Sequence, residues 1–487
     1  VSLDPIAITD QKLWNFDSPN LYEGTVRLLD GDTELDNVAT YFGQRKVSTE
    51  KYDGRNYEYI YVNNEPVFLS GLLDQGFWEE GIYTAPSEEA LKYDIKAMRD
   101  RGFNMIRKHL KIEDPLQYFW ADRLGMFVWQ DMPHATYMNA KSYGGETPGR
   151  EVYEYALESM LNRDYNHPCV IAVMLFNETW GIDHNGQKAS DGMTTNEWIQ
   201  HLYSKAKELN PHLLVEDMSA CNNDHIQPTD LNTFHMYPKG YQSSKDTVAD
   251  RERNTYPGST NNFWGGFQQE SEPWLNSEYG GVAAFDGDYD VSWCFKYQTD
   301  IQRQYEKLNG FVYTEPYDIE YERNGVLTYD RRDKIFGYED VAYGGDMTIL
   351  DLNQPNYVGV DINPAIKAAP GSQYTAPVVA MNWSGETLEN PVLKWRFDAT
   401  DIYGNYITTG KSGEVALDYA PYTREQHDIS FSLPNQKCVG TFTVWIENNG
   451  EKIAKNFVNV IVTNGKDTAP VRILTEASAV LRRFQHH

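Results

Sequence analysis

The pattern of hydrophobic and polar positions divides the chain into three parts. Up to about residue 50, apolar and polar residues alternate, as in Leu21–Leu29, and a turn signal follows at 30–32, which predicts strands. From there to about residue 345, strand-like apolar runs alternate with helical patterns. Beyond residue 346, short alternating runs return between Asn-Gly, Ser-Gly and Pro-rich turns, which predicts a β-sandwich.

The most informative segment is the apolar run Val170–Phe176, which ends abruptly at Asn177 and Glu178. A continuous apolar run of this length, with a helical pattern on each side, predicts a strand buried on both faces. A second segment, at 273–281, has the same form and ends in Glu278 followed by Tyr-Gly-Gly. Each segment therefore places a carboxylate at the end of a predicted strand.

Strand-like runs recur eight times between about residues 61 and 315, and helical patterns separate them. Ser87 and the capping box Thr194–Glu197 indicate where two of the helices begin. Eight such units predict a single (β/α)8 barrel, which usually spans about 250 residues. We therefore expect a multidomain fold, with a barrel at 51–345 and a C-terminal β-sandwich at 346–487. Residues 1–50 form strands without a core of their own.

Composition narrows the classes of function. The 487 residues include 71 acidic and 43 basic ones, giving a formal net charge of −28, which argues against nucleic acid and anionic membrane surfaces as partners. Aromatic residues make up 14% of the chain; such rings can stack on sugars, although core packing explains them equally well. The four cysteines lack CxxC spacing, so neither a zinc site nor a disulfide framework is predicted.

No apolar stretch reaches the ~18 residues that a membrane span needs, so we expect no membrane insertion. The chain opens on Val1 rather than on Met, which fits a leader that has been removed. We therefore expect a periplasmic or secreted protein. We leave the oligomeric state open, and a homo-oligomer is one of the states considered.

The two glutamates suggest a chemistry. In a barrel of this kind, Glu178 ends the fourth strand and Glu278 the seventh, so both project from the same rim toward one cleft. Carboxyl groups about 5–5.5 Å apart act as nucleophile and acid/base in retaining hydrolysis of glycosidic bonds. One glutamate at a strand end is more often a salt-bridge partner or a helix cap. Two at corresponding positions of a barrel favour catalysis.

Other classes of function lack their motifs. There is no HxH or HExxH pair for a metal-dependent hydrolase, no GxSxG and no GxGxxG or P-loop. We expect no cofactor and no catalytic metal, and we interpret Asp286–Asp290 as a solvated acidic turn rather than a structural cation site. His134, His184 and His225 are expected at the surface. The remaining alternative is a catalytically inactive barrel that binds carbohydrate or acts as a scaffold.

Several motifs together resemble one known family, glycoside hydrolase family 2. The resemblance covers essentially the whole chain. The N-terminal segment, with Tyr41–Arg45, is similar to the end of the family's immunoglobulin-like domain, so residues 1–50 are expected to be the C-terminal part of such a sandwich. We expect no counterpart of the family's preceding jelly-roll domain within these 487 residues, and we leave open whether the missing N-terminal domains belong to the same polypeptide. Within the predicted barrel, the motifs that carry the resemblance are Gly102–His109, Val128–Asp131, Asn166–Pro168, Asn177-Glu178, His235–Pro238, Ser277–Gly281 and Thr328–Arg331.

The resemblance implies roles for individual residues of these motifs. Glu178 would be the acid/base and Glu278 the nucleophile of a retaining mechanism. Asn177 would bond the 2-hydroxyl of the sugar, and Tyr237 would donate a hydrogen bond to Glu278.

Four further residues would bind the substrate. Arg107, Asp131 and His235 would line the subsite of the terminal sugar. Tyr313 stands at the end of strand eight, where many relatives carry Trp, and is expected to contact the substrate as well.

The resemblance therefore predicts a retaining exo-β-glycosidase that releases terminal β-linked sugars from oligo- or polysaccharides. A β-galactosidase is favoured. A β-mannosidase is an alternative because Val128–Asp131 is similar to that branch. A β-glucuronidase is less favoured because the Asn-x-Lys uronate clamp of that branch occurs beyond Glu278 only at 435–437 and 464–466, inside the predicted sandwich.

Overall fold

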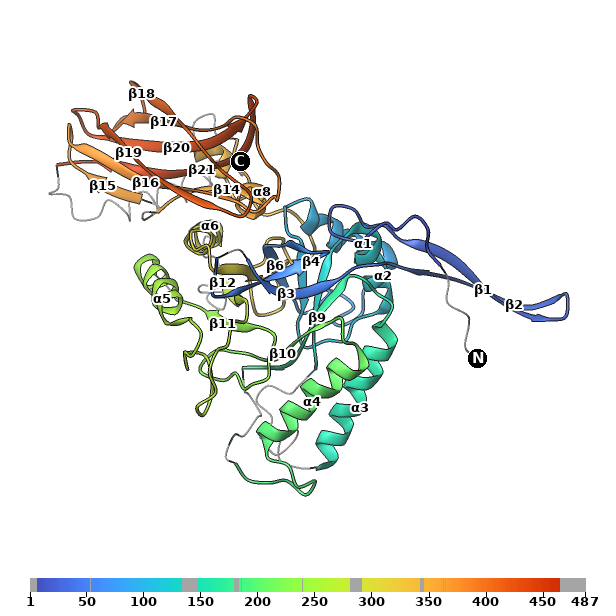
Figure 1. The fold of residues 1–487 in the computed structure, drawn as a ribbon. Coiled ribbons are helices and arrows are strands. Elements are labelled where there is room, and N and C mark those ends of the chain that lie inside the picture. Colours follow the sequence, from blue (N-terminus) through green and yellow to red (C-terminus); the bar gives the residue numbers. More distant parts are fainter. Residues whose placement is uncertain are drawn as a thin grey trace.

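The computed structural model consists of a barrel, a sandwich attached to one side of it and a projecting N-terminal hairpin (Figure 1). No helix in the described part of the chain is long and apolar enough to cross a membrane. The described residues are 7–52, 54–133, 147–178, 184, 186–238, 240–280, 291–341, 346–361, 363 and 365–464.

Eight parallel strands form the barrel, in the hydrogen-bonded order β10-β9-β8-β7-β6-β13-β12-β11. The two end strands, β10 and β11, are bridged where the His235 amide donates to the Ala220 carbonyl at 2.9 Å. This nearly closed barrel with flanking sheets confirms the predicted fold class. The strands are β6 (Leu69–Asp74), β7 (Met105–Lys108), β8 (Phe127–Asp131), β9 (Val170–Asn177), β10 (Leu214–Ser219), β11 (Asn232–Met236), β12 (Trp274–Gly280) and β13 (Leu308–Thr314).

Helices surround the barrel. The predicted N-caps are present: Ser87 caps α1, and Thr194 and Glu197 form a reciprocal capping box on α4. The helices are α1 (Glu88–Arg99), α2 (Pro115–Leu124), α3 (Thr147–Asp164), α4 (Thr195–Leu209), α5 (Tyr241–Asn254), α6 (Val291–Gln302), α7 (Tyr338–Val341) and α8 (Leu350–Asn353).

The connection between β10 and β11 differs from the predicted eight strand–helix units, because residues 220–231 contain no helix. This segment is short and polar, has no apolar helical stripe and carries Pro228. It instead runs back along β10, where the Asp230 amide donates to the Val215 carbonyl at 2.9 Å.

The N-terminal segment contributes two small sheets. The strands β1 (Tyr22–Asp30) and β2 (Thr33–Phe42) pair as an antiparallel hairpin that extends away from the barrel (Figure 1). β3 (Val47–Lys51), β4 (Glu58–Val62) and β5 (Glu65–Pro66) form the second sheet. That the hairpin belongs to an immunoglobulin-like sandwich stays a prediction, as do the domain boundaries at 50 and 345.

The C-terminal strands form two facing sheets around their own apolar core. The sandwich is fastened to α6 by buried polar contacts: the Tyr357 hydroxyl donates to Asp300 at 2.7 Å, and the Lys296 ammonium donates to the Phe457 carbonyl at 3.0 Å. The strands are β14 (Asn356–Val360), β15 (Ala365–Ala368), β16 (Gln373–Asn382), β17 (Pro391–Asp401), β18 (Tyr406–Ala416), β19 (Arg424–Ser432), β20 (Cys438–Asn448) and β21 (Glu451–Val462).

His225 corrects a prediction, because it is fully buried rather than at the surface. Its Nδ1 lies 2.8 Å from a carboxylate oxygen of Asp217, and its Nε2 lies 3.1 Å from the carbonyl oxygen of Thr233, to which a protonated ring donates. Burial alone would lower the pKa of His225, but Asp217 and Glu216 outweigh it and raise the pKa to about 9. The imidazolium thus ties the helix-free connection to β10 and β11. His184 is half-buried, and His134 lies outside the described residues.

This ion pair makes the stability depend on pH. The pKa of His225 is about 9 in the folded chain, above its ordinary value of 6.5. The ion pair therefore contributes its full free energy to folding below pH 6.5, and this contribution is lost as the pH rises through 9. Thermal unfolding followed from about pH 6 to about pH 10 should show the midpoint of the wild type falling across this window. His225→Gln should flatten this part of the curve, whereas the exposed His201→Gln should not. Parallel curves for wild type and His225→Gln would contradict the assignment.

Candidate active site

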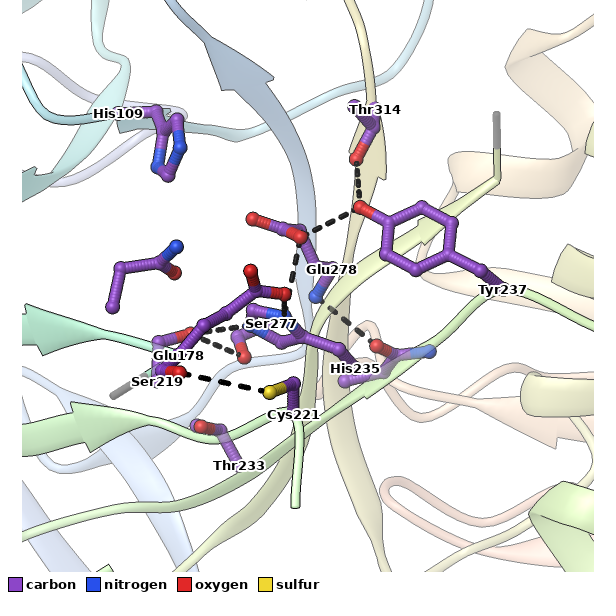
Figure 2. A network of polar contacts seen from close by, with 12 residues as sticks. His109, Glu178, Ser219, Cys221, Thr233, His235, Tyr237, Ser277, Glu278 and Thr314 are labelled. Atoms are coloured by element: carbon purple, nitrogen blue, oxygen red, sulfur yellow. Dashed lines mark hydrogen bonds and ion pairs between the residues drawn. The ribbon is translucent and has the colours of Figure 1, made fainter. Parts of the chain in front are cut away.

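Glu178 and Glu278 meet at the carboxyl-terminal mouth of the barrel (Figure 2). Glu178 directly follows β9, and Glu278 lies within β12. Their nearest carboxylate oxygens are within 4.8 Å of each other. Glu178 adopts a left-handed backbone conformation (φ 59°), and its amide donates to the Ser219 carbonyl on the neighbouring strand at 2.9 Å. The turn that aims this carboxylate across the mouth is therefore fixed by the barrel itself.

His235, on β11, bridges the two carboxylates. Its Nδ1 lies 2.6 Å from Glu178 Oε1 and 3.1 Å from Glu278 Oε2. Its Nε2 lies 2.8 Å from the hydroxyl of Ser219, which in turn donates to the hydroxyl of Ser277 at 2.8 Å. The ring therefore has a polar contact at each nitrogen and lies between the two carboxylates and Ser219.

Tyr237 supports Glu278 from the other side. Its hydroxyl donates to Glu278 Oε2 at 2.6 Å and lies 3.3 Å from the Thr314 hydroxyl. Although 44% of Tyr237 is exposed, its hydroxyl is enclosed, and this enclosure, followed by the charge of Glu278, raises the pKa of Tyr237 well above its ordinary value of 10. The phenol therefore stays protonated and remains a donor. The sequence motif around Tyr237 gave no indication that Thr314 takes part.

Arg107 lies beneath the pair and contacts both catalytic strands. Its Nε is 3.0 Å from Asp131 Oδ2, and its Nη1 donates to the Ser277 carbonyl at 2.8 Å and lies 3.6 Å from Glu278 Oε1. Its Nη2 donates to Asn177 Oδ1 at 2.8 Å. Burial alone would lower the pKa of Arg107, but the carboxylates of Asp131 and Glu278 raise it. One guanidinium thus aligns the residue before Glu178 and the residue before Glu278.

The structure brings together seven of the eight predicted site residues. Two of the seven differ in detail from the prediction: the side chains of Arg107 and Asp131 are 0% exposed, so they present no surface to a substrate in this structure. The physical reason is that each neutralises the other's charge, which allows both to be buried.

Tyr313 is the eighth, and its placement does not match the prediction. It is 1% exposed, its hydroxyl donates to the Asn324 carbonyl at 2.6 Å and its ring packs against Phe295 of α6. Side chains alternate along a strand, so Tyr313 faces the helix layer while its neighbour Thr314 faces the mouth.

Glu178, His235 and Glu278 are also a set that could hold a metal ion, since one ligand atom from each lies within 4.8 Å of the others. The hydrogen bonds among these side chains account for the arrangement equally well. The acidic turn Asp286–Asp290 lies outside the described residues.

Comparison with known proteins identifies the barrel. The model of "Glycosyl hydrolases family 2, TIM barrel domain" matches residues 55–348, and that of "Glycosyl hydrolases family 2" matches residues 2–45. A β-galactosidase of Photobacterium profundum is 25% identical over 482 residues, which are 92% of this chain and 42% of that protein. A putative β-glucuronidase of Formosa agariphila is 29% identical over 175 residues, 36% of this chain and 16% of that protein. The chain therefore spans less than half the length of these relatives.

Solved structures share the fold. The apo structure of Bacteroides uniformis β-glucuronidase 3 matches with a TM-score of 0.55 and 16% identity, covering 93% of this chain and 55% of that one. A β-galacturonidase from Eisenbergiella tayi bound to galacturonate matches with a TM-score of 0.53 and 18% identity, covering 69% of this chain and 60% of that one.

The buried pair beneath the carboxylates can be tested with Asp131→Asn. Removing one charge of a buried ion pair leaves the other uncompensated and costs about 3–5 kcal/mol, so we expect a clear fall in the midpoint of thermal unfolding. The exposed pair of Arg123 and Glu23 supplies the control, because Glu23→Gln should change the midpoint little. An unchanged midpoint in Asp131→Asn would show that Arg107 does not depend on this partner.

Proposed function

We propose that this chain, which belongs to glycosyl hydrolase family 2, acts as a retaining exo-β-glycosidase that releases terminal β-linked sugars from oligo- or polysaccharides. The observation that supports this most is that one carboxylate oxygen of Glu178 and one of Glu278 lie within 4.8 Å of each other, and that both carboxylates contact the same Nδ1 of His235, at 2.6 and 3.1 Å. Retaining enzymes hold their carboxyls about 5–5.5 Å apart, whereas inverting enzymes need about 6.5–9.5 Å to admit a water molecule.

The contacts of the two glutamates support different roles. The Tyr237 hydroxyl and the Arg107 guanidinium face Glu278, whose side chain is 8% exposed, and such partners suit a carboxylate nucleophile. Glu178 is more open, at 21% side-chain exposure, which suits a group that exchanges protons with a leaving group and with water.

The reaction then proceeds in two steps. A Glu278 oxygen attacks the anomeric carbon while Glu178 donates its proton to the departing glycosidic oxygen, which leaves a glycosyl ester on Glu278 and an ionised Glu178. A water molecule gives a proton to Glu178 and attacks the anomeric carbon, which releases the sugar with its configuration retained and restores both carboxyls. Asn177, whose Oδ1 accepts a hydrogen bond from Arg107, would bond the 2-hydroxyl of the sugar, and its position beside Glu178 supports this role.

For the terminal sugar we favour a β-galactoside, with β-mannoside and β-glucuronide as alternatives. Relatives named β-galactosidase and β-glucuronidase both occur among the matches. A catalytically inactive carbohydrate-binding or scaffold protein is the alternative of a different class. We further propose a periplasmic or secreted location, where polysaccharides are met.

The catalytic pair is tested by turnover of aryl β-glycosides: galactoside, mannoside, glucuronide, glucoside and xyloside. Glu278→Gln should lower kcat at least about a thousandfold with an unchanged thermal midpoint, because it removes the nucleophile. With an activated leaving group, Glu178→Ala should regain activity in azide, because this anion attacks the glycosyl ester in place of water and needs no general base, and the product should be the β-glycosyl azide. An α-azide, or near-normal activity of Glu278→Gln, would contradict the assignment.

The hydrogen bond from Tyr237 to Glu278 can be tested separately. A hydrogen bond to a charged group is worth about 1.5–3 kcal/mol, so Tyr237→Phe should lower kcat/KM about ten- to hundredfold. Glu278 and Tyr237 should then be non-additive, since Tyr237→Phe in a Glu278→Gln background should have no further effect on the residual rate. Full activity in the single Tyr237→Phe variant would contradict this role.

A further inference from the structure

A pocket of about 620 Å³ lies at the end of the barrel opposite the catalytic mouth. Pro168 and His212, which line it, stand just before β9 and β10 begin, whereas Glu178 directly follows the end of β9. The eight residues of β9 separate these two ends by roughly 26 Å. The volume is within the range of about 300–1,000 Å³ that is usual for small-molecule sites, so the pocket is a second candidate site.

Three asparagines in its lining are each held by one end of the side-chain amide. Asn166 donates to the Tyr41 carbonyl, and Asn64 accepts from the Lys46 ammonium at 2.9 Å. Asn210, which is 5% exposed, accepts from the backbone amide of the residue two positions on, at 3.2 Å. The other polar atom of each amide has no hydrogen-bond partner within the described part of the chain. The pocket wall therefore carries one acceptor and two donors that a ligand can use.

Arg45 adds a further donor to the lining. Its Nε donates to the Pro168 carbonyl at 2.8 Å, and its Nη2 donates to the Val170 carbonyl at 2.5 Å. Nη1 donates to none of the described residues. Burial lowers the pKa of Arg45, but a guanidinium stays charged at neutral pH, so Nη1 offers its N–H groups to a ligand.

The chemistry of the lining favours one class of ligand. None of the described residues that line the pocket is acidic, although the chain has 71 Asp and Glu residues, so a basic ligand would find no counter-charge. The net charge of −28 opposes the approach of an anionic chain. Donors and acceptors in one pocket match hydroxyl groups, which can donate and accept at once. Tyr165, which is 55% exposed, adds a flat ring that can cover the C–H face of a sugar.

We propose that this pocket is a second saccharide-binding site, which holds a neutral sugar through the ring of Tyr165 and the three asparagine amides. The inference goes beyond the proposed function, because binding at this end of the barrel needs neither Glu178 nor Glu278. A sugar chain held here would keep the protein on a polysaccharide and raise the effective concentration of chain ends near the catalytic mouth.

Disaccharides and two small changes in the lining test this site. We would titrate Glu278→Gln by calorimetry with four neutral disaccharides, β-1,4-galactobiose, β-1,4-mannobiose, cellobiose and xylobiose, and with digalacturonate as the anionic comparison. Tyr165→Ala and Asn64→Gly are then combined in this background. Asn64 has a left-handed backbone (φ 68°), which glycine adopts readily, so the second change removes only the side chain. Tyr155→Ala is the matched control, since Tyr155 is 71% exposed and lies outside the lining.

We expect at least one neutral disaccharide to bind, and the double change to weaken one binding event at least about tenfold, because it removes a stacking surface and a hydrogen-bond donor. Tyr155→Ala should leave the affinity unchanged. In the chain with Glu278 intact, the double change should also leave the thermal midpoint and the turnover of aryl β-glycosides unchanged, because both altered side chains are exposed and remote from the catalytic mouth.

Affinities that the double change leaves unaltered, no binding of any neutral disaccharide, or tighter binding of digalacturonate than of all four would each overturn the proposal. A parallel loss of aryl-glycoside turnover would overturn it as well, because the pocket would then not be separate from the catalytic site. Disaccharide binding that the double change weakens, in a chain that turns over none of the aryl glycosides, would overturn the proposed hydrolysis and leave this second site standing.

Discussion

The buried ion pair of Arg107 and Asp131 is the interaction on which the site depends. A guanidinium and a carboxylate with no exposure to water are costly unless they are fully paired, so this position accepts little variation in geometry. The remaining nitrogens of Arg107 are committed to Asn177 and Ser277, the residues immediately before the two glutamates. The requirement to satisfy one buried charge therefore fixes the relative positions of β9 and β12.

Above this pair, the site is a layer of shared hydrogen bonds rather than a set of independent residues. His235 contacts both carboxylates, and Ser219 links its far nitrogen to Ser277. Ser219 and His235 belong to β10 and β11, the two end strands of the barrel sheet, which are not joined by a continuous set of strand hydrogen bonds. The ion pair of His225 and Asp217 stabilises the connection between these two strands. These polar contacts thus hold β10 and β11 together, where the described residues provide few strand-to-strand hydrogen bonds and no connecting helix.

Much of this arrangement could be predicted from the sequence, because it depends on local patterns. The apolar run before Asn177 predicted a buried strand, and the end of that strand located Glu178. The predictions failed where the outcome depends on which face of a strand a side chain takes. A shift of one residue separates Tyr313, which packs on α6, from Thr314, which reaches the mouth. Likewise, no sequence pattern distinguishes a surface histidine from one buried against an aspartate, as His225 is.

The hairpin formed by β1 and β2 has a consequence of a different kind. On one of its faces Val26 lies opposite Val38, with Leu28 beside them, and all three are at least half exposed. A two-stranded ribbon is marginally stable by itself, and an exposed apolar face with free strand edges is a surface on which other chains can add. The exposed apolar face of the hairpin is therefore a surface through which this chain would associate with other chains.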